Sequence, residues 1–229
     1  MGTILASSLV TKASTLLNDV SNTRWSQTQL LGWMSDAQRI VAIQIPGASN
    51  KSVSMQLVAG TRQQIPSDGW ILSDVFRNMG MDGNTPGRAI RLISRNVMDS
   101  TNPTWHSDPT STTVINYLYD PNDQTYFWVY PPSPGGNYVQ VNYVYITPEV
   151  TSLTTTLNVS DVLEPVILDY MMYRAMMVDA EYAPGTALAQ QYLQSFMAGV
   201  AGYQKGTTDD NPNWSLKMPF DPSKMGSNG

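Results

Sequence analysis

The spacing of apolar residues predicts helices at both ends of the chain. Near the N-terminus they recur every three to four positions, which places them on one face of a helix of about five turns. The positions are Leu5, Leu9, Ala13, Leu16 and Val20. A second helix is predicted after Trp25, because Ser26 and Gln29 have the spacing of a capping box, and Pro46 marks its end.

From about residue 49 to residue 160 the apolar period changes to two, which is typical of strands. Strands are predicted at 114–119, 126–130 and 138–145, where β-branched and aromatic residues concentrate. Gly60 and Thr61 predict a hairpin between strands at 53–58 and 63–65. The stretches 70–78 and 88–93 fit either strands or short helical pieces.

Helical spacing returns at Ser160 or Asp161, with Pro165 tolerated in the first turn. Residues 166–181 are apolar on nearly every side, and a last helix is predicted over 186–204. Arg174 has no acidic residue three or four positions away, so its partner is expected on another helix or another subunit. The candidate subunit contacts are Arg174, Asp179, Asp36 and Arg39.

These patterns predict an α+β fold with a discontinuous helical domain. Residues 1–48 and 160–205 form its two N-terminal and two C-terminal helices, arranged like a four-helix bundle. Residues 49–159 form an antiparallel, β-rich insertion domain. Residues 206–229 form an extended C-terminal arm, which carries large apolar side chains that an inert linker would not need.

Composition excludes several function classes. The 229 residues include no cysteine and one histidine, which rules out disulfides, thiolate zinc sites and most hydrolase triads. The net charge of −5 and the isoelectric point of about 4.7 argue against a protein that binds nucleic acid through its phosphates. The same charge does not argue against a protein that lets DNA slide past it. No apolar run approaches the ~20 residues of a membrane span.

Candidate chemistry is sparse, and we expect no catalytic residue, cofactor or metal site. His106 with Asp108 could be imagined as an oriented general base, but a loop histidine beside a tryptophan is more often structural. Asp120, Asn122 and Asp123 carry calcium-type oxygen ligands, yet their spacing matches no complete ion loop and suits a turn.

An aromatic face is predicted on one strand. Tyr126, Trp128 and Tyr130 alternate on one side, while Phe127 and Val129 take the other. Sheets commonly bury such a face in the core. If it is exposed, contact with another protein is the first expectation and stacking on sugars the second.

Several short peptide blocks occur in an order that resembles the head–tail adaptor (connector) proteins of tailed bacteriophages. The resemblance covers roughly residues 3–200. The blocks are Arg24–Trp25, Leu30–Trp33, Asp36–Arg39, Gly60–Pro66, Val75–Gly80, Tyr119–Pro121, Tyr130–Pro132, Leu168–Tyr170, Tyr173–Ala175 and Asp179–Tyr182.

The resemblance implies a non-enzymatic virion protein at the head–tail junction, assembled in the host cytoplasm. It implies a ring of about twelve copies that docks on the portal protein, supports a tail or nozzle protein and lets DNA pass through its lumen without specific binding. It also implies C-terminal arms that insert between portal subunits. The arm residues expected to anchor there are Trp214, Leu216, Met218 and Phe220. The alternative is a carbohydrate-binding tail or capsid decoration module that uses the tyrosine-rich sheet.

Overall fold

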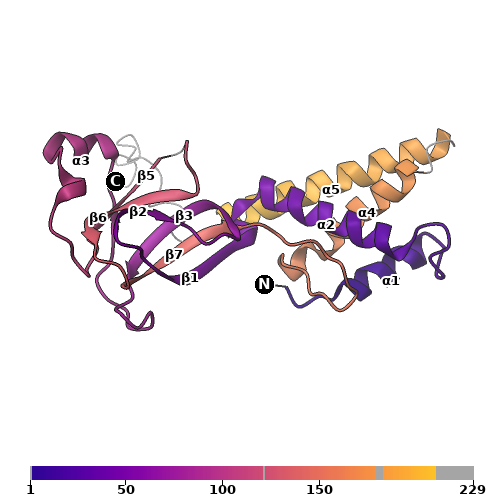
Figure 1. The fold of residues 1–229 in the computed structure, drawn as a ribbon. Helices are drawn as coiled ribbons and strands as arrows, with labels where there is room; N and C mark the ends of the chain where they lie inside the picture. Colours follow the sequence, from indigo (N-terminus) through magenta and orange to yellow (C-terminus); the bar gives the residue numbers. More distant parts are fainter. Residues whose placement is uncertain (1, 121, 179–182, 210–229) are drawn as a thin grey trace, which may run out of the picture. The chain divides into compact units, whose positions relative to one another are not determined.

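The computed structural model describes residues 2–120, 122–178 and 183–209. Their contacts divide the chain into two compact units. The helical unit comprises the described residues up to Ile45 and from Glu149 onward, and the β unit is Pro46–Pro148. The described residues form five α helices and two sheets, so the predicted α+β class is confirmed (Figure 1).

The helical unit is built around α4. Its helices are α1 (Ala6–Leu16), α2 (Gln27–Gln44), α4 (Glu164–Val178) and α5 (Ala183–Asp209). Helix α4 contacts all three of the others, which explains why its apolar residues are not confined to one stripe (Figure 1). The four-helix bundle goes beyond these contacts and stays a prediction. Because α5 continues to Asp209, the first residues of the predicted arm, 206–209, are helical.

The turn between α1 and α2 is held by Asp19. Its carboxylate accepts hydrogen bonds from the backbone N–H groups of Thr23, Arg24 and Trp25 at 2.9–3.0 Å, and from the Thr23 hydroxyl at 2.8 Å. The prediction that the first helix continues to Val20 was wrong: α1 ends at Leu16, and Val20 is 75% exposed. The predicted capping box of α2 is confirmed.

Residues 149–159 belong to the helical unit, although the alternating pattern placed them in the β insertion. Two side chains of α2 explain this. The Ser35 hydroxyl accepts from the Val150 N–H at 2.8 Å, and the Gln38 side-chain oxygen accepts from the Asn158 N–H at 2.8 Å. The segment therefore gains its hydrogen bonds from a helix instead of from a neighbouring strand.

The β unit contains two sheets. The first has the antiparallel order β1 (Asn50–Gln56), β7 (Tyr138–Tyr145), β3 (Gly69–Asn78). The second has the order β2 (Gly60–Gln64), β6 (Tyr126–Ser133), β5 (Asn116–Tyr119), β4 (Arg91–Leu92). In the second sheet β4 and β5 run parallel and the other pairs are antiparallel.

The predicted hairpin at Gly60 was wrong. Strand β1 pairs with β7 and β2 pairs with β6, so the chain passes from one sheet to the other between them. Buried Leu57 lies at this crossing. Its N–H donates to the Asn137 carbonyl at 2.8 Å, which ties the crossing to the segment before β7.

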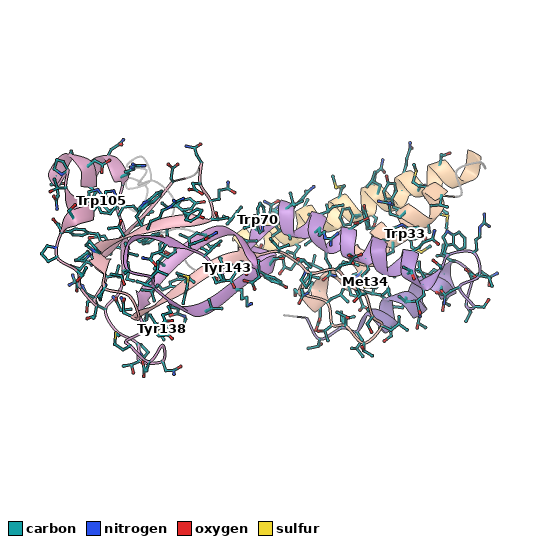
Figure 2. The ribbon with its side chains drawn as sticks, in the orientation of Figure 1. Trp33, Met34, Trp70, Trp105, Tyr138 and Tyr143 are labelled. Atoms are coloured by element: carbon teal, nitrogen blue, oxygen red, sulfur yellow. The ribbon has the colours of Figure 1, made fainter. Side chains whose placement is uncertain are left out.

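Both sheets contribute to a common apolar core. Phe127 and Val129 of β6 and Val139, Val141 and Tyr143 of β7 belong to one buried cluster. Tyr143 is labelled in Figure 2. Its hydroxyl donates to Asp68 at 2.8 Å, and Lys51 pairs with the same carboxylate at 2.7 Å. The aromatic ring is therefore buried while its polar end keeps a partner.

A buried asparagine joins the strands at one side of the β unit. The Asn78 side-chain amide donates to the carbonyls of Arg88 and Val114 at 2.9 and 2.8 Å, and its oxygen accepts from the Val114 N–H at 2.8 Å. Residues 87–90 hydrogen bond to β3, whereas Arg91 and Ile93 hydrogen bond to the segment of β5. Asn78 thus fixes the point where the chain passes from one sheet to the other.

We predict that Asn78→Ala lowers the free energy of unfolding by about 2–3 kcal/mol, because buried backbone groups lose their partners. Chemical denaturation of the full chain measures this. Asn84→Ala is the matched control: the Asn84 side chain donates to a backbone carbonyl in an exposed turn, and a change below about 0.5 kcal/mol is expected. Equal effects of the two substitutions would contradict the role given to Asn78.

The turn at Asp19 predicts a pH dependence. Hydrogen bonds from Trp25, Thr23 and Arg24 lower the pKa of Asp19 from its ordinary value of 3.8 to about 2. A carboxyl group with a lowered folded-state pKa stabilises the protein above its unfolded-state pKa, and this contribution is lost as the pH falls towards the folded value. Wild type is therefore expected to be more stable than Asp19→Asn near neutral pH.

The difference between the two proteins should shrink as the pH falls from 3.8 to about 2. Thermal unfolding across this range measures it, and other carboxylates affect both proteins alike. A difference in stability that stays constant with pH would show that the negative charge of Asp19 does not contribute to the stability of the turn.

Candidate interaction surfaces

An ion cluster joins α2 and α4. Asp36 lies 3.5 Å from Arg174 and 3.9 Å from Arg39, measured between carboxylate oxygen and guanidinium nitrogen. The Arg174 guanidinium also donates to the Tyr170 hydroxyl at 3.2 Å. The side chains of this cluster are 39–47% exposed, so they remain available to a neighbour. The structure thus gives Arg174 a partner on another helix of the same chain, and their role as subunit contacts stays a prediction.

The other predicted contact residues of the helical unit fall outside the described residues. These are Asp179 and the four arm residues Trp214, Leu216, Met218 and Phe220.

The aromatic face of β6 is half-buried. Phe127 and Val129 are fully buried on one side, as the alternation predicts, and Tyr126, Trp128 and Tyr130 lie on the other. Two of the three pack against a small cluster formed by Met98, Trp105 and Leu118. Guanidinium groups lie over the rings as well: Arg62 at 3.9 Å from Tyr126 and Arg95 at 5.6 Å from Trp128. Much of the face is therefore covered by the chain itself.

His106 is part of the packing around Trp105. The two rings stack with centroids 3.7 Å apart, and the His106 Nδ1 atom hydrogen bonds to the Thr61 hydroxyl at 2.8 Å. Asp108 instead accepts from Asn102 at 2.6 Å and from the Tyr130 hydroxyl at 3.0 Å. This arrangement matches the structural role expected of the histidine.

The acidic turn after β5 is closed by its own side chains. Asp120 accepts from the backbone N–H and the side-chain amide of Asn122, and Asp123 pairs with Arg62 at 3.6 Å. Within the described part of the chain no three acidic or histidine side chains gather as a metal site would require.

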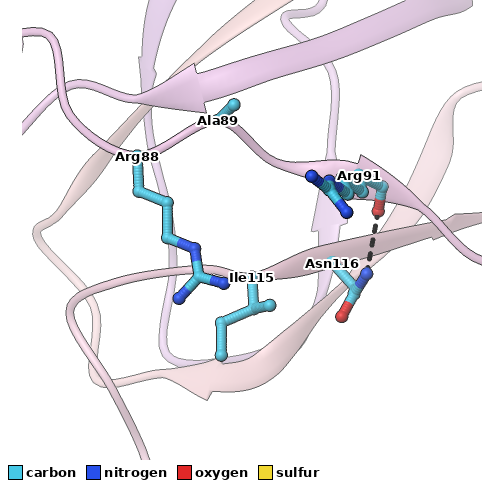
Figure 3. Close-up of a pocket in the computed structure, with 5 residues that line it drawn as sticks. All are labelled: Arg88, Ala89, Arg91, Ile115 and Asn116. Carbon is cyan, nitrogen blue, oxygen red and sulfur yellow. Dashed lines mark hydrogen bonds between the residues drawn. The ribbon is translucent and has the colours of Figure 1, made fainter.

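One surface was not predicted from the sequence. Arg88 and Arg91 line a cleft of about 370 Å³ at the edge of the second sheet, together with Ala89, Ile115 and Asn116 (Figure 3). The Asn116 side chain donates to the Arg91 carbonyl at 3.3 Å, which fixes this edge. A clue in the sequence was that no acidic residue lies within four positions of either arginine.

A comparison with protein families identifies the family of the chain. The model described as SU10 adaptor protein matches residues 4–219, almost the whole chain. The chain belongs to the SU10 adaptor family. No curated protein matches it.

Membership makes this a phage head–tail adaptor, as the peptide blocks had indicated. SU10 adaptors form a structural family, typically without enzymatic activity, and an adaptor implies interaction with portal and tail proteins at the head–tail junction. Across the described ranges, the helices are too short or too polar to span a bilayer.

The ion cluster gives a testable distinction between folding and assembly. Because the side chains are well exposed, Arg174→Ala and Asp36→Ala are each expected to change the free energy of unfolding of the free chain by less than about 1 kcal/mol. If these residues contact a neighbouring subunit, assembly with the other virion proteins should fall in both variants. Sedimentation of the protein mixed with the other virion proteins measures assembly. Unchanged assembly would show that Arg174 and Asp36 are not subunit contacts.

Proposed function

We propose that this protein docks as a ring on the phage portal, joins the capsid vertex to the tail and lines the channel through which DNA leaves. The family match over nearly the whole chain carries this proposal. The ring is proposed to hold about twelve copies, assembled in the host cytoplasm, with a tail or nozzle protein below.

The surface of the helical unit supports repeated contacts between copies. At the end of α4, Met177 is 44% and Val178 65% exposed, and Leu188 in the first turns of α5 is exposed too. Chain connectivity brings these ends together, because only a short segment separates the two helices. Neighbouring exposed apolar side chains are typical of a surface that meets another protein.

The charge of the chain supports an unobstructed channel. A net charge of −5 per copy repels a DNA duplex, so a ring of such copies would not retain the DNA that passes. Many weak, repeated contacts then hold the ring, since closure and multivalency make the joint far more stable than any single contact.

The last twenty residues, 210–229, are proposed to form the arm that reaches the portal. Deleting them should leave the helical and β units folded, because α5 already ends at Asp209. The truncated chain should fail to join purified portal rings, which analytical ultracentrifugation of the mixture detects. If the truncated chain attached to the portal as strongly as wild type, residues 210–229 would not be the portal-binding arm.

A point-variant version separates the anchors from the length of the arm. Trp214→Ala, Leu216→Ala and Phe220→Ala together should abolish attachment to the portal. The matched control replaces three exposed apolar residues of the β unit: Val58→Ala, Met81→Ala and Ile146→Ala, which are 55–62% exposed. Attachment lost in both triple variants would indicate general loss of apolar surface instead of specific anchoring.

A further inference from the structure

Three arginines of the β unit differ in their surroundings from the unit's other three cations. Those three pair with acids within the chain: Lys51 with Asp68, Arg62 with Asp123 and Arg95 with Asp99. Within the described ranges, no acidic side chain lies within ion-pair distance of Arg77, Arg88 or Arg91. All three residues are exposed.

Strand pairing brings the backbones of the three arginines close together. Arg77 of β3 is directly opposite Ala89, and Ala89 lines the same cleft as Arg88 and Arg91. We call Arg77, Arg88 and Arg91 the arginine cluster. In Figure 3, Arg88 lies on one side of Ile115, while Arg91 and Asn116 lie on the other. An anionic group that enters the cleft would therefore meet cations from two sides.

The backbone that presents the cluster is fixed. The Arg88 carbonyl accepts from both the N–H and the side-chain amide of Asn78 at 2.9 Å. The Arg91 N–H donates to Ile115 at 3.1 Å, and the Arg91 carbonyl accepts from Asn116. Arg88 and Arg91 thus extend from a hydrogen-bonded backbone, and binding has to order only their side chains.

We propose that this cleft binds an acidic segment of another protein chain, with carboxylates paired to Arg88 and Arg91. Arginine pairs with carboxylates through two parallel hydrogen bonds and is enriched at protein interfaces. Phe76, which is 40% exposed, precedes Arg77 in β3, and Leu92, which is 63% exposed, follows Arg91 in β4. A partner segment with apolar residues beside its carboxylates would cover them.

A nucleic acid fits this surface less well. A duplex is held by cations that follow its phosphates over a long distance, whereas this cluster is short and belongs to a chain with a net charge of −5. The exposed apolar residues next to the arginines in the chain, Phe76 and Leu92, would gain nothing from a phosphate backbone. Charge and composition therefore favour an acidic protein segment.

Binding of a short acetylated and amidated peptide rich in glutamate and leucine tests the proposal. The full chain is titrated by isothermal calorimetry at low salt, in parallel with a DNA duplex. Wild type should bind the peptide, and the double variant Arg88→Ala/Arg91→Ala should bind it at least about tenfold more weakly. Thermal unfolding confirms that the variant is folded.

The double variant Arg62→Ala/Arg95→Ala is the control, because it removes two arginines from the same unit that already pair with Asp123 and Asp99. It should bind the peptide as wild type does. Equal loss in both double variants would reduce the effect to net charge and reject the site. No binding of the peptide by wild type, or stronger binding of DNA that depends on Arg88 and Arg91, would also overturn the proposal. The portal takes no part in this test, so its outcome is independent of portal docking.

Discussion

Buried backbone N–H and C=O groups need hydrogen-bond partners, and this requirement organises the connections of both units. Where no helix or strand supplies the partner, a polar side chain does. Asp19 hydrogen bonds to the backbone of the turn between α1 and α2, and Ser35 and Gln38 hydrogen bond to the segment that returns from the β unit. Asn78 hydrogen bonds to the backbone where the chain crosses between the sheets. Packing of the apolar faces depends on these connections, because they set which strands and helices can meet.

The sequence predicted individual helices and strands better than it predicted which of them pair or pack together. The alternation of β6 and β7 and the capping box of α2 depend on residues close in the chain, so local pattern was enough. The hairpin at Gly60 failed because both flanking strands find partners from residues 126–145, far along the sequence. Residues 149–159 were misplaced for the same reason. Their partners are on α2, and no local pattern reports a hydrogen bond to a distant helix.

The candidate surfaces show the same division. The absence of a nearby acid correctly indicated that Arg174 needs a distant partner, but only the fold shows that the partner is Asp36. The arginine cluster gave no signal as a group, since Arg77 joins the other two through strand pairing. The aromatic residues of β6 gave a strong signal, yet the chain itself covers much of their face. Chemical type is visible in a sequence, whereas availability depends on tertiary packing.

Charge sets the main constraint on assembly. In the proposed ring, copies that each carry −5 repel one another, and salt screens this repulsion over about 8–10 Å at physiological ionic strength. Close contact between copies must then rest on apolar surface or on cations that face a neighbour's acids. Most described cations of the chain are already paired internally, so they add little to such contacts. A cation without an internal partner can offset the repulsion at one defined place, and this is why the arginine cluster is better placed than the paired cations to select a partner.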